Sequence, residues 1–454
     1  MCGITGMIHL EQDLRQQEAL LRKMQETLRR RGPDQEGIFL SPRCAMAHTR
    51  LAVIDVEKGR QPMEITAGGE TYTIVYNGEL YNTPELRTQL EQEGVVFQTH
   101  CDTEVVLQSY AHWGPRCVEQ CNGIFAFAVW EHTAQRLFLA RDRIGVKPLF
   151  YAEIPGGLVF GSEIKALLQH PDVPHEIDQN GVADLLLLGP GRTPGYGVFR
   201  TVREVKPAHC GYYMQGSLHL HPYWELHAAV HTDSFAETAA HVRELLTDAV
   251  RRQLVSDVPI GTFLSGGLDS SLLSSLSSQV LRERGETLHT FSVDYWDNDR
   301  YFRKSHFQPT SDPAYIRAME RYLAVSITGR CWIRQRWQRR FMPPWMPEIC
   351  RAWWTWTVPC CCSAARSERK SLWRFPANVL TNCSAAIPGT GMRMYAVSTV
   401  SPGRRVPPIG QSSSVRSWRK RSTPRRMSRM PMSAPFVPQK SYRRIRRWNP
   451  GCGK

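Results

Sequence analysis

The chain has 454 residues, enough for two or three domains, and a formal net charge of +15. The charge is uneven, because residues 1–324 carry a net charge of −9 and residues 325–454 carry +24. The sequence shows neither a basic segment followed by an apolar stretch at its start nor an apolar run long enough to span a bilayer, so we expect a cytoplasmic protein with reduced cysteines and no membrane partner.

Cys2 is the first residue that suggests a chemistry. If Met1 is removed, the chain starts with a cysteine whose thiol and α-amine lie within reach of each other. An α-amine titrates near pH ~8, so part of it is neutral at pH 7 and can accept the thiol proton. A cysteine at this position also arises by chance, and only the rest of the sequence decides between the two interpretations.

Residues 1 to about 210 predict a layered α+β domain. Short β-type runs separated by turns are found at 46–49, 72–76, 124–130 and 136–142. The last two runs predict a hairpin that turns at residues 132–134. Apolar residues at helical spacing predict a helix over 12–30, and residues 103–113 predict a second helix.

Six short motifs follow one another in this region. They are Cys2-Gly3-Ile4, Arg31-Gly32-Pro33-Asp34, His48-Thr49-Arg50-Leu51, Tyr76-Asn77-Gly78-Glu79-Leu80-Tyr81-Asn82, Asp102-Thr103-Glu104 and Arg141-Asp142-Arg143-Ile144-Gly145-Val146-Lys147-Pro148-Leu149. Together they resemble the N-terminal-nucleophile (Ntn) glutaminase domain of class II amidotransferases, most of all in the asparagine synthetase branch. The resemblance extends over residues 2–165 and implies a glutaminase domain over 2–210.

The resemblance implies catalytic roles for Cys2, Asn77 and Gly78. Cys2 would attack the side-chain amide of glutamine, while the Asn77 side chain and the backbone N–H of Gly78 would bind the developing oxyanion. Arg50 would bind the α-carboxylate of glutamine, and Asp102 would bind its α-ammonium group. The implied glutamine-binding set is Arg50, Leu51, Asn77, Gly78, Glu79 and Asp102.

Each of these residues also has an ordinary structural interpretation. Asn77-Gly78 is a strong hairpin-turn dipeptide. Arg50 could lie on a solvated strand edge, and Asp102 could cap the helix that starts near residue 103. The order of all the motifs behind Cys2 favours the glutaminase interpretation.

A second domain is predicted over residues 225–324, after a closing hairpin and linker at 210–224. Helical spacing predicts a helix over 235–255, and the apolar run 258–264 predicts a buried strand. The strand leads directly into Ser265-Gly266-Gly267-Leu268-Asp269-Ser270-Ser271 and another helix, an order that presents backbone N–H groups to phosphate. Residues 291–294 predict the next parallel strand, which makes this a parallel-sheet α/β domain.

The loop at 265–271 resembles the PP-loop of ATP pyrophosphatases, although a Gly/Ser turn before a helix is the ordinary alternative. The resemblance implies that Asp269 holds Mg²⁺ on the phosphates of ATP. The implied ATP-binding residues are Leu264, Ser265, Gly266, Gly267, Asp269, Ser270 and Val293. A glutaminase joined to a PP-loop domain implies the glutamine-dependent asparagine synthetase family, with glutamine, aspartate and ATP as substrates and a homodimeric assembly.

Residues 325–454 do not continue this pattern. They contain no Asp or His, only two acids, and seven Cys without paired CxxC spacing, so neither zinc nor a specific nucleic-acid partner is indicated. As written, the segment after about residue 324 is expected to be irregular or disordered. The family's acidic motif resembling SGEGADELFGGY is missing from the sequence.

We interpret this segment as the product of a shifted reading frame. When the third base of each codon is joined to the first two bases of the next, residues 375–392 permit Ser-Gly-Glu-Cys-Ala-Asp-Glu-Leu-Phe-Gly-Gly-Tyr-Pro-Trp-Tyr-Arg-Asp. The synthetase half would then be defective in the chain as written. The alternatives are an amidotransferase with glutaminase activity only, or a non-enzymatic binding protein with a genuine basic tail.

Overall fold

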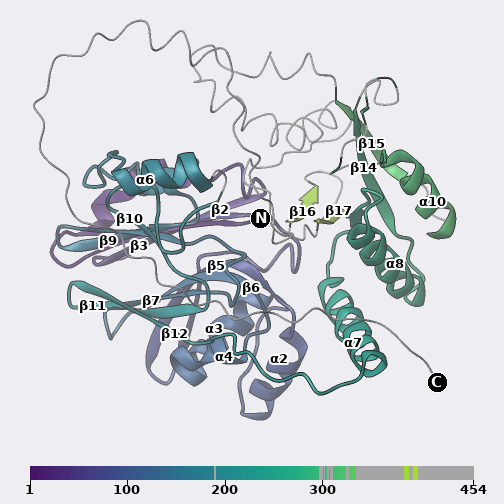
Figure 1. Ribbon diagram of the computed structural model, residues 1–454. Helices are drawn as coiled ribbons and strands as arrows, with labels where there is room; N and C mark the ends of the chain where they lie inside the picture. Colours follow the sequence, from purple (N-terminus) through teal and green to yellow (C-terminus); the bar gives the residue numbers. More distant parts are fainter. Residues whose placement is uncertain are drawn as a thin grey trace, which may run out of the picture. The chain divides into compact units, whose positions relative to one another are not determined.

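The computed structural model describes residues 1–188, 191–295, 300, 302–303, 306, 310–323, 327–333, 383–387 and 392–396 (Figure 1). The chain divides into two units, Met1–Val400 and Ser401–Lys454. All the elements below belong to the first unit. Among the described residues, no helix is long and apolar enough to cross a membrane.

The first antiparallel sheet has the strand order β10-β8-β9-β1-β3-β2. Its strands are β1 (Gly3–His9), β2 (Gln35–Leu40), β3 (Cys44–Arg50), β8 (Phe150–Ile154), β9 (Gly157–Gly161) and β10 (Val202–Glu204). Gly3 pairs with Thr49, so the start of β1 lies beside the end of β3. This register brings the chain terminus next to the His48-Thr49-Arg50-Leu51 motif.

The second antiparallel sheet has the order β12-β11-β7-β6-β5-β4. Its strands are β4 (Met63–Ala67), β5 (Glu70–Leu80), β6 (Gly123–Glu131), β7 (Arg136–Arg141), β11 (His209–Met214) and β12 (Ser217–Pro222). The predicted hairpin at 132–134 is confirmed, because β6 and β7 pair around it. The closing hairpin predicted at 210–224 is β11 and β12, so the second sheet extends to Pro222.

The two sheets stack face to face, with helices on their outer faces (Figure 1). Strand β6 shows why, because its side chains alternate between two apolar environments. Ala126, Ala128 and Trp130 face the core between the sheets. Phe125 and Phe127 face the core beneath the helices. A strand buried on both sides in this way requires a layered domain, as the sequence predicts.

The helix predicted over 12–30 is shorter than expected. It comprises η1 (Leu14–Gln17) and α1 (Glu18–Glu26), which pack on the outer face of the first sheet. After Glu26 the chain continues in tight turns, in which the N–H of Arg31 donates to the carbonyl of Leu28. Gly32 and Pro33 follow and prevent the helix from continuing.

The remaining helices of this domain are mostly on the second sheet. The helix predicted over 103–113 is confirmed as α3 (Asp102–Trp113), which packs against β5. The others are α2 (Thr83–Gln92), η2 (Gly114–Arg116), α4 (Cys117–Gln120), α5 (Ile164–Leu167), α6 (Gln179–Ala183) and η3 (Asp184–Leu188).

Residues 235–323 form a parallel α/β arrangement, as predicted. Its elements are α7 (Phe235–Gln253), β13 (Ile260–Phe263), α8 (Leu268–Glu283), β14 (His289–Tyr295) and α10 (Pro313–Leu323). Strands β13 and β14 pair in parallel, which requires the crossover that α8 provides. The apolar residues of α7, α8 and β13 share one core, in which Val250, Val280 and Leu281 are buried.

Beyond Leu323 the structure describes three strands, β15 (Ile327–Ile333), β16 (Cys383–Ile387) and β17 (Met392–Ala396), in the sheet order β15-β14-β13-β17-β16. The other residues after 324 lie outside the described part of the chain. The expectation that this segment is irregular, and the shifted-frame motif over 375–392, therefore fall largely outside it.

Candidate active site

One pocket brings together the residues that the sequence assigns to glutamine. It lies where the start of β1, the end of β3, the last residues of β5 and the start of α3 meet. Its lining residues are Met1, Cys2, Arg50, Leu51, Val53, Ile54, Gly59, Gln61, Tyr76, Asn77, Gly78, Glu79, Cys101, Asp102, Thr103 and Lys147. Every predicted catalytic and glutamine-binding residue is among them.

Cys2 is held in this pocket mainly through its backbone. Arg31 donates from Nε to the carbonyl of Cys2 at 2.9 Å, and its Nη1 forms an ion pair with Glu163 at 3.0 Å. Both side chains are buried. The Met1 ammonium donates to the carbonyl of Arg31 at 3.1 Å, while the thiol of Cys2 lies 3.8 Å from the carbonyl oxygen of Leu51. The backbone of Cys2 is therefore held in place, while its sulfur makes only one long contact with the protein.

Close backbone contact explains the glycine of the Arg31-Gly32-Pro33-Asp34 motif. A Cβ added to Gly32 would lie 2.3 Å from the carbonyl carbon and oxygen of Thr49. The next acid, Asp34, accepts the N–H of Ala52 at 2.9 Å. The motif thus packs the turn after α1 directly against the end of β3, beside the nucleophile.

Asn77 and Gly78 lie inside β5, so their hairpin-turn interpretation is wrong. They pair with Ala126 and Phe125 of β6, and the register between these two neighbouring strands overrides the local turn preference. Asn77 is 1% exposed, and its side-chain Nδ2 has no hydrogen-bond partner among the described residues. A buried amide donor without a partner on a pocket wall is available to a ligand.

Arg50 is buried at the pocket and does not lie on a solvated strand edge. Its Nη1 donates to the side chain of Gln35 and to the carbonyl of Val56, both at 2.9 Å. Its Nη2 donates to the carbonyls of Ile54 and Asp55 at 2.9 and 2.7 Å. Three of these four bonds hold the loop after β3 and the fourth reaches β2, an anchoring role that the sequence did not indicate.

Asp102 is the first residue of α3 and is 7% exposed. Its Oδ2 accepts the O–H of Tyr76 and the N–H of Leu80, both at 3.2 Å, so it bridges the helix to β5. Burial raises the pKa of this carboxyl group, which the Leu80 and Tyr76 hydrogen bonds oppose. The alternative interpretation of Asp102 as the N-cap of this helix is wrong. The N-cap residue is Cys101, whose side chain makes no capping hydrogen bond.

His48 connects the two sheets above the pocket. Its Nε2 lies 3.1 Å from the carbonyl oxygen of Tyr76, so this nitrogen carries the proton. Burial lowers the pKa of His48 to about 3, which keeps the ring neutral at physiological pH. The residue therefore joins the sheets by a hydrogen bond and takes no part in proton transfer at neutral pH.

Several lining residues received no role from the sequence, among them Gln61, Thr103 and Lys147. Gln61 accepts the N–H of Tyr76 at 2.6 Å and donates to the hydroxyl of Thr103 at 3.0 Å. Lys147 belongs to a quoted motif but received no role. Their place in the pocket depends on contacts between segments that are far apart in the sequence, which local patterns do not reveal.

The predicted phosphate loop has the expected strand–loop–helix geometry. Gly266 has a φ of +80°, which favours glycine, and α8 begins directly after Gly267 without a side-chain cap. The hydroxyls of Ser265 and Ser270 lie 2.9 Å apart, and Ser270 also donates to the carbonyl of Gly267. These contacts shape an exposed turn with the first N–H groups of a helix facing outward.

The other predicted ATP residues are placed as follows. Leu264 is fully buried at the end of β13, and Asp269 is exposed in the first turn of α8. Val293 lies in β14, but its side chain is outside the described part of the structure. The described residues contain no group of three or more metal-ligating side chains. One carboxylate fits a Mg²⁺ ion that is held mainly by the phosphates of its nucleotide.

The pocket lies in a region that sequence comparison assigns to the glutamine amidotransferase domains. Residues 1–224 match the family model described as glutamine amidotransferase domain. Residues 241–329 match the model described as asparagine synthase. Over these residues the chain is similar to the glutamine-hydrolysing asparagine synthetases.

Curated relatives agree with this assignment. Asparagine synthetase [glutamine-hydrolyzing] 3 of Bacillus subtilis is 48% identical over 74% of this chain and 55% of its own length. Asparagine synthetase [glutamine-hydrolyzing] 1 of the same organism is 34% identical over 65% of this chain and 46% of its own length. Asparagine synthetase B of Escherichia coli is 31% identical over 64% of this chain and 49% of its own length. The chain thus spans about half the length of these relatives.

Proposed function

We propose that residues 1–224 hydrolyse glutamine to glutamate and ammonia with Cys2 as the nucleophile. The Cys2 sulfur attacks the side-chain carbonyl carbon of glutamine, and the α-amine of processed Cys2 takes the thiol proton and passes it to the leaving ammonia. Water then hydrolyses the resulting thioester and regenerates the thiol. In this proposal Arg50, Leu51, Glu79 and Asp102 hold the amino-acid part of the substrate.

The buried, unpartnered amide of Asn77 is the observation that carries this proposal. Leaving a buried donor unsatisfied costs about 1–3 kcal/mol, which a folded protein normally avoids. The cost is recovered when a negatively charged oxygen forms next to the donor. Asn77 Nδ2 and the N–H of Gly78 on the same pocket wall as Cys2 match the requirements of an oxyanion site.

The Asn77 assignment predicts a loss of kcat. Asn77→Ala is expected to lower kcat for glutamine hydrolysis by roughly 10²–10³-fold with little change in KM, because the lost donor acts on the transition state. Steady-state glutamate release from the full chain measures this. Asn82→Ala is the matched control, since Asn82 bonds to Gln120 outside the pocket. Equal activity of Asn77→Ala and wild type would remove the oxyanion assignment.

The Asp102 assignment predicts a pH-dependent KM. The charged carboxylate binds the α-ammonium of glutamine, and burial raises its pKa, so this binding weakens on acidification earlier than for an ordinary aspartate. KM should therefore rise as the pH falls through the raised pKa. Asp102→Asn should raise KM about 10- to 100-fold and remove this part of the pH dependence. A KM profile of Asp102→Asn parallel to that of wild type would contradict the assignment.

We propose that the second domain begins an ATP site for asparagine synthesis. ATP would adenylate the side-chain carboxylate of aspartate with release of pyrophosphate, and ammonia would displace AMP to give asparagine. Backbone N–H groups of the 265–271 loop would bind pyrophosphate, with Ser265, Gly266, Gly267 and Ser270 shaping the loop. Leu264 and Val293 would meet the adenine, and Asp269 would bind Mg²⁺, which neutralises phosphate charge.

We further propose that the chain leaves the family's reading frame near residue 324. Two observations support this: the asparagine synthase match ends at residue 329, and the shifted frame permits the missing acidic motif. The homodimer and the cytoplasmic location stay predictions.

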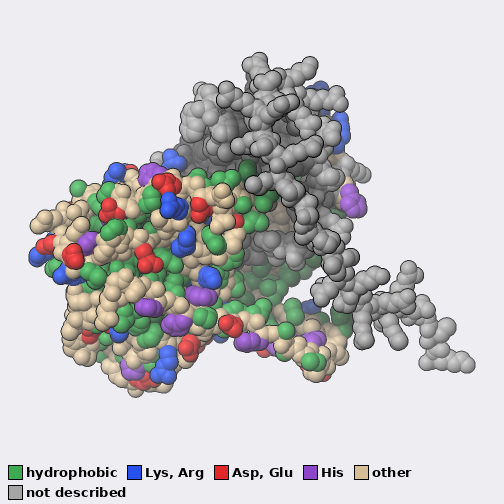
Figure 2. All heavy atoms as spheres, turned by 60° about the vertical axis from the view of Figure 1, so that its left-hand side comes forward, with side chains coloured by type: hydrophobic (Ala, Val, Ile, Leu, Met, Phe, Trp, Pro, Cys, Tyr) green, Lys and Arg blue, Asp and Glu red, His purple; other side chains and the backbone are tan. Residues whose placement is uncertain are grey.

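On the face shown in Figure 2, acidic and basic side chains of the described residues are interspersed.

A further inference from the structure

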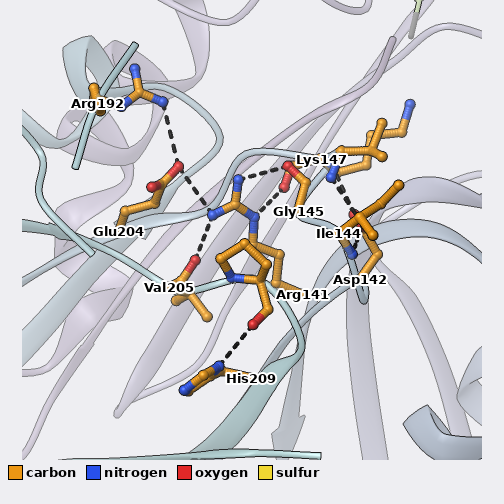
Figure 3. Close-up of polar contacts among 11 residues, drawn as sticks. Arg141, Asp142, Ile144, Gly145, Lys147, Arg192, Glu204, Val205 and His209 are labelled. Carbon is orange, nitrogen blue, oxygen red and sulfur yellow. Dashed lines mark hydrogen bonds and ion pairs between the residues drawn. The ribbon is translucent and has the colours of Figure 1, made fainter. Parts of the chain in front are cut away.

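The loop that carries Lys147 is fixed by a buried carboxylate (Figure 3). Asp142 accepts the N–H groups of Ile144, Val146 and Lys147 at 3.2, 2.9 and 2.9 Å. Arg141 donates from Nε to the carbonyl of Lys147 at 2.7 Å. The backbone of Lys147 is therefore held from both sides.

Arg141 is itself anchored from the side away from the pocket. It donates to the carbonyls of Gly145 and Val205 and forms an ion pair with buried Glu204 at 3.0 Å (Figure 3). Arg192 contacts the same carboxylate at 3.4 Å. These contacts fix the backbone position from which the Lys147 side chain extends into the pocket.

The side-chain nitrogen of Lys147 lies near the N-terminus of the chain. Lys147 is 2% exposed and lines the same pocket as Cys2. Its Nζ lies 3.3 Å from Sδ of Met1, the residue whose removal frees the α-amine of Cys2. A buried lysine side chain thus lines the same pocket as Cys2 and contacts the side chain of the residue that precedes it.

Other charges around Cys2 are already engaged with the protein. Arg50 is surrounded by carbonyls of the 54–56 loop, and Arg31 is paired with Glu163. Asp102 accepts hydrogen bonds from Tyr76 and Leu80, and burial raises the pKa of the Cys101 thiol, which favours its neutral form. Glu79 and Tyr76 also line the pocket.

We propose that Lys147 is an electrostatic partner of the nucleophile, and that its ammonium group keeps the α-amine of processed Cys2 in the neutral, proton-accepting form. This inference rests on the proposed glutaminase function. Two like charges that line the same pocket repel each other even at an effective dielectric constant of ~20. Removing the lysine charge should therefore let the α-amine bind a proton more easily, by an amount on the order of one pH unit.

The test is the pH profile of kcat/KM for glutamine hydrolysis by the full chain. In Lys147→Met the midpoint of the acid limb should move upward by on the order of one pH unit, with activity about tenfold lower at pH 7 and unchanged near pH 9. Lys147→Arg should keep the wild-type midpoint. Lys23→Met, which removes an exposed charge from α1, is the matched control.

The midpoint does not depend on how much of the preparation is folded, so partial misfolding of Lys147→Met leaves the result interpretable. If that variant does not fold at all, Lys147→Gln takes its place, with Cys2 alkylation by iodoacetamide at pH 7 expected to be slower than in wild type. A uniform loss at every pH, or an unmoved midpoint, overturns the Lys147 inference alone. A wild-type chain without glutaminase activity overturns the proposed function.

Discussion

Replacement of Cys2 by Ala is expected to abolish glutamine hydrolysis, with a loss of kcat of roughly 10⁴–10⁶-fold. The thiol is the group that forms the covalent bond, and no other lining residue is placed to replace it. The fold should be unaffected, because the Cys2 sulfur makes only a 3.8 Å contact with the carbonyl of Leu51 while the backbone is held by Arg31. Glutamate release from the full chain, with removal of Met1 verified by mass, measures the effect.

Cys101 provides the control for this experiment. It is a second thiol on the same pocket wall, and burial raises its pKa, so it is a poor nucleophile at neutral pH. Cys101→Ala should therefore keep most of the activity. If Cys2→Ala turns over glutamine near the wild-type rate, or if Cys101→Ala alone is inactive, the nucleophile is misassigned.

The chain as written is expected to make no asparagine from ATP and aspartate, with either glutamine or free ammonia as the nitrogen source. It keeps the phosphate loop at 265–271 but lacks the acidic motif that the family places on the other side of the pyrophosphate. Restoring one base near codon 324 should recover synthesis from both nitrogen sources. Product formation by the two proteins, measured with labelled aspartate, is the test.

Glutamine hydrolysis serves as the internal control, because it should be present in both proteins. This control distinguishes a loss of synthetase activity alone from a failure of the whole chain to fold. If the literal 454-residue protein makes asparagine from ATP, aspartate and ammonia, the shifted-frame interpretation is wrong. If the restored frame gives no asparagine while hydrolysis persists, the lesion lies elsewhere.

The sequence predicts those residues of the glutaminase pocket that belong to short motifs. Cys2, Asn77 and Asp102 each lie in a quoted motif, and the pocket contains all of them. Their surroundings could not be predicted. Local preference favours a turn at Asn77-Gly78, whereas pairing with β6 places both in a strand. The bonds between Gln61 and Thr103 join residues 42 positions apart, which no local pattern reveals.

The second domain was predicted for a different physical reason. A buried strand, a small-residue loop and a helix are adjacent in the chain, so their geometry is local and the order alone indicates it. The parallel pairing of β13 and β14 follows from the intervening helix α8. By contrast, α1 ends where a turn begins that places Arg31 against the carbonyl of Cys2. This contact joins residues that are far apart in the sequence, so local patterns do not predict where the helix ends.

The position of Met1 has a consequence for how the protein is made. In the unprocessed chain Met1 lines the pocket, and the nitrogen of Cys2 is a peptide amide with no basicity. In the proposed mechanism a newly synthesised molecule is therefore a precursor, because the α-amine that serves as the base does not exist until Met1 is removed. In a strongly overexpressing host, where N-terminal trimming lags behind translation, specific activity should report the trimmed fraction of the preparation and not the intrinsic rate of the enzyme.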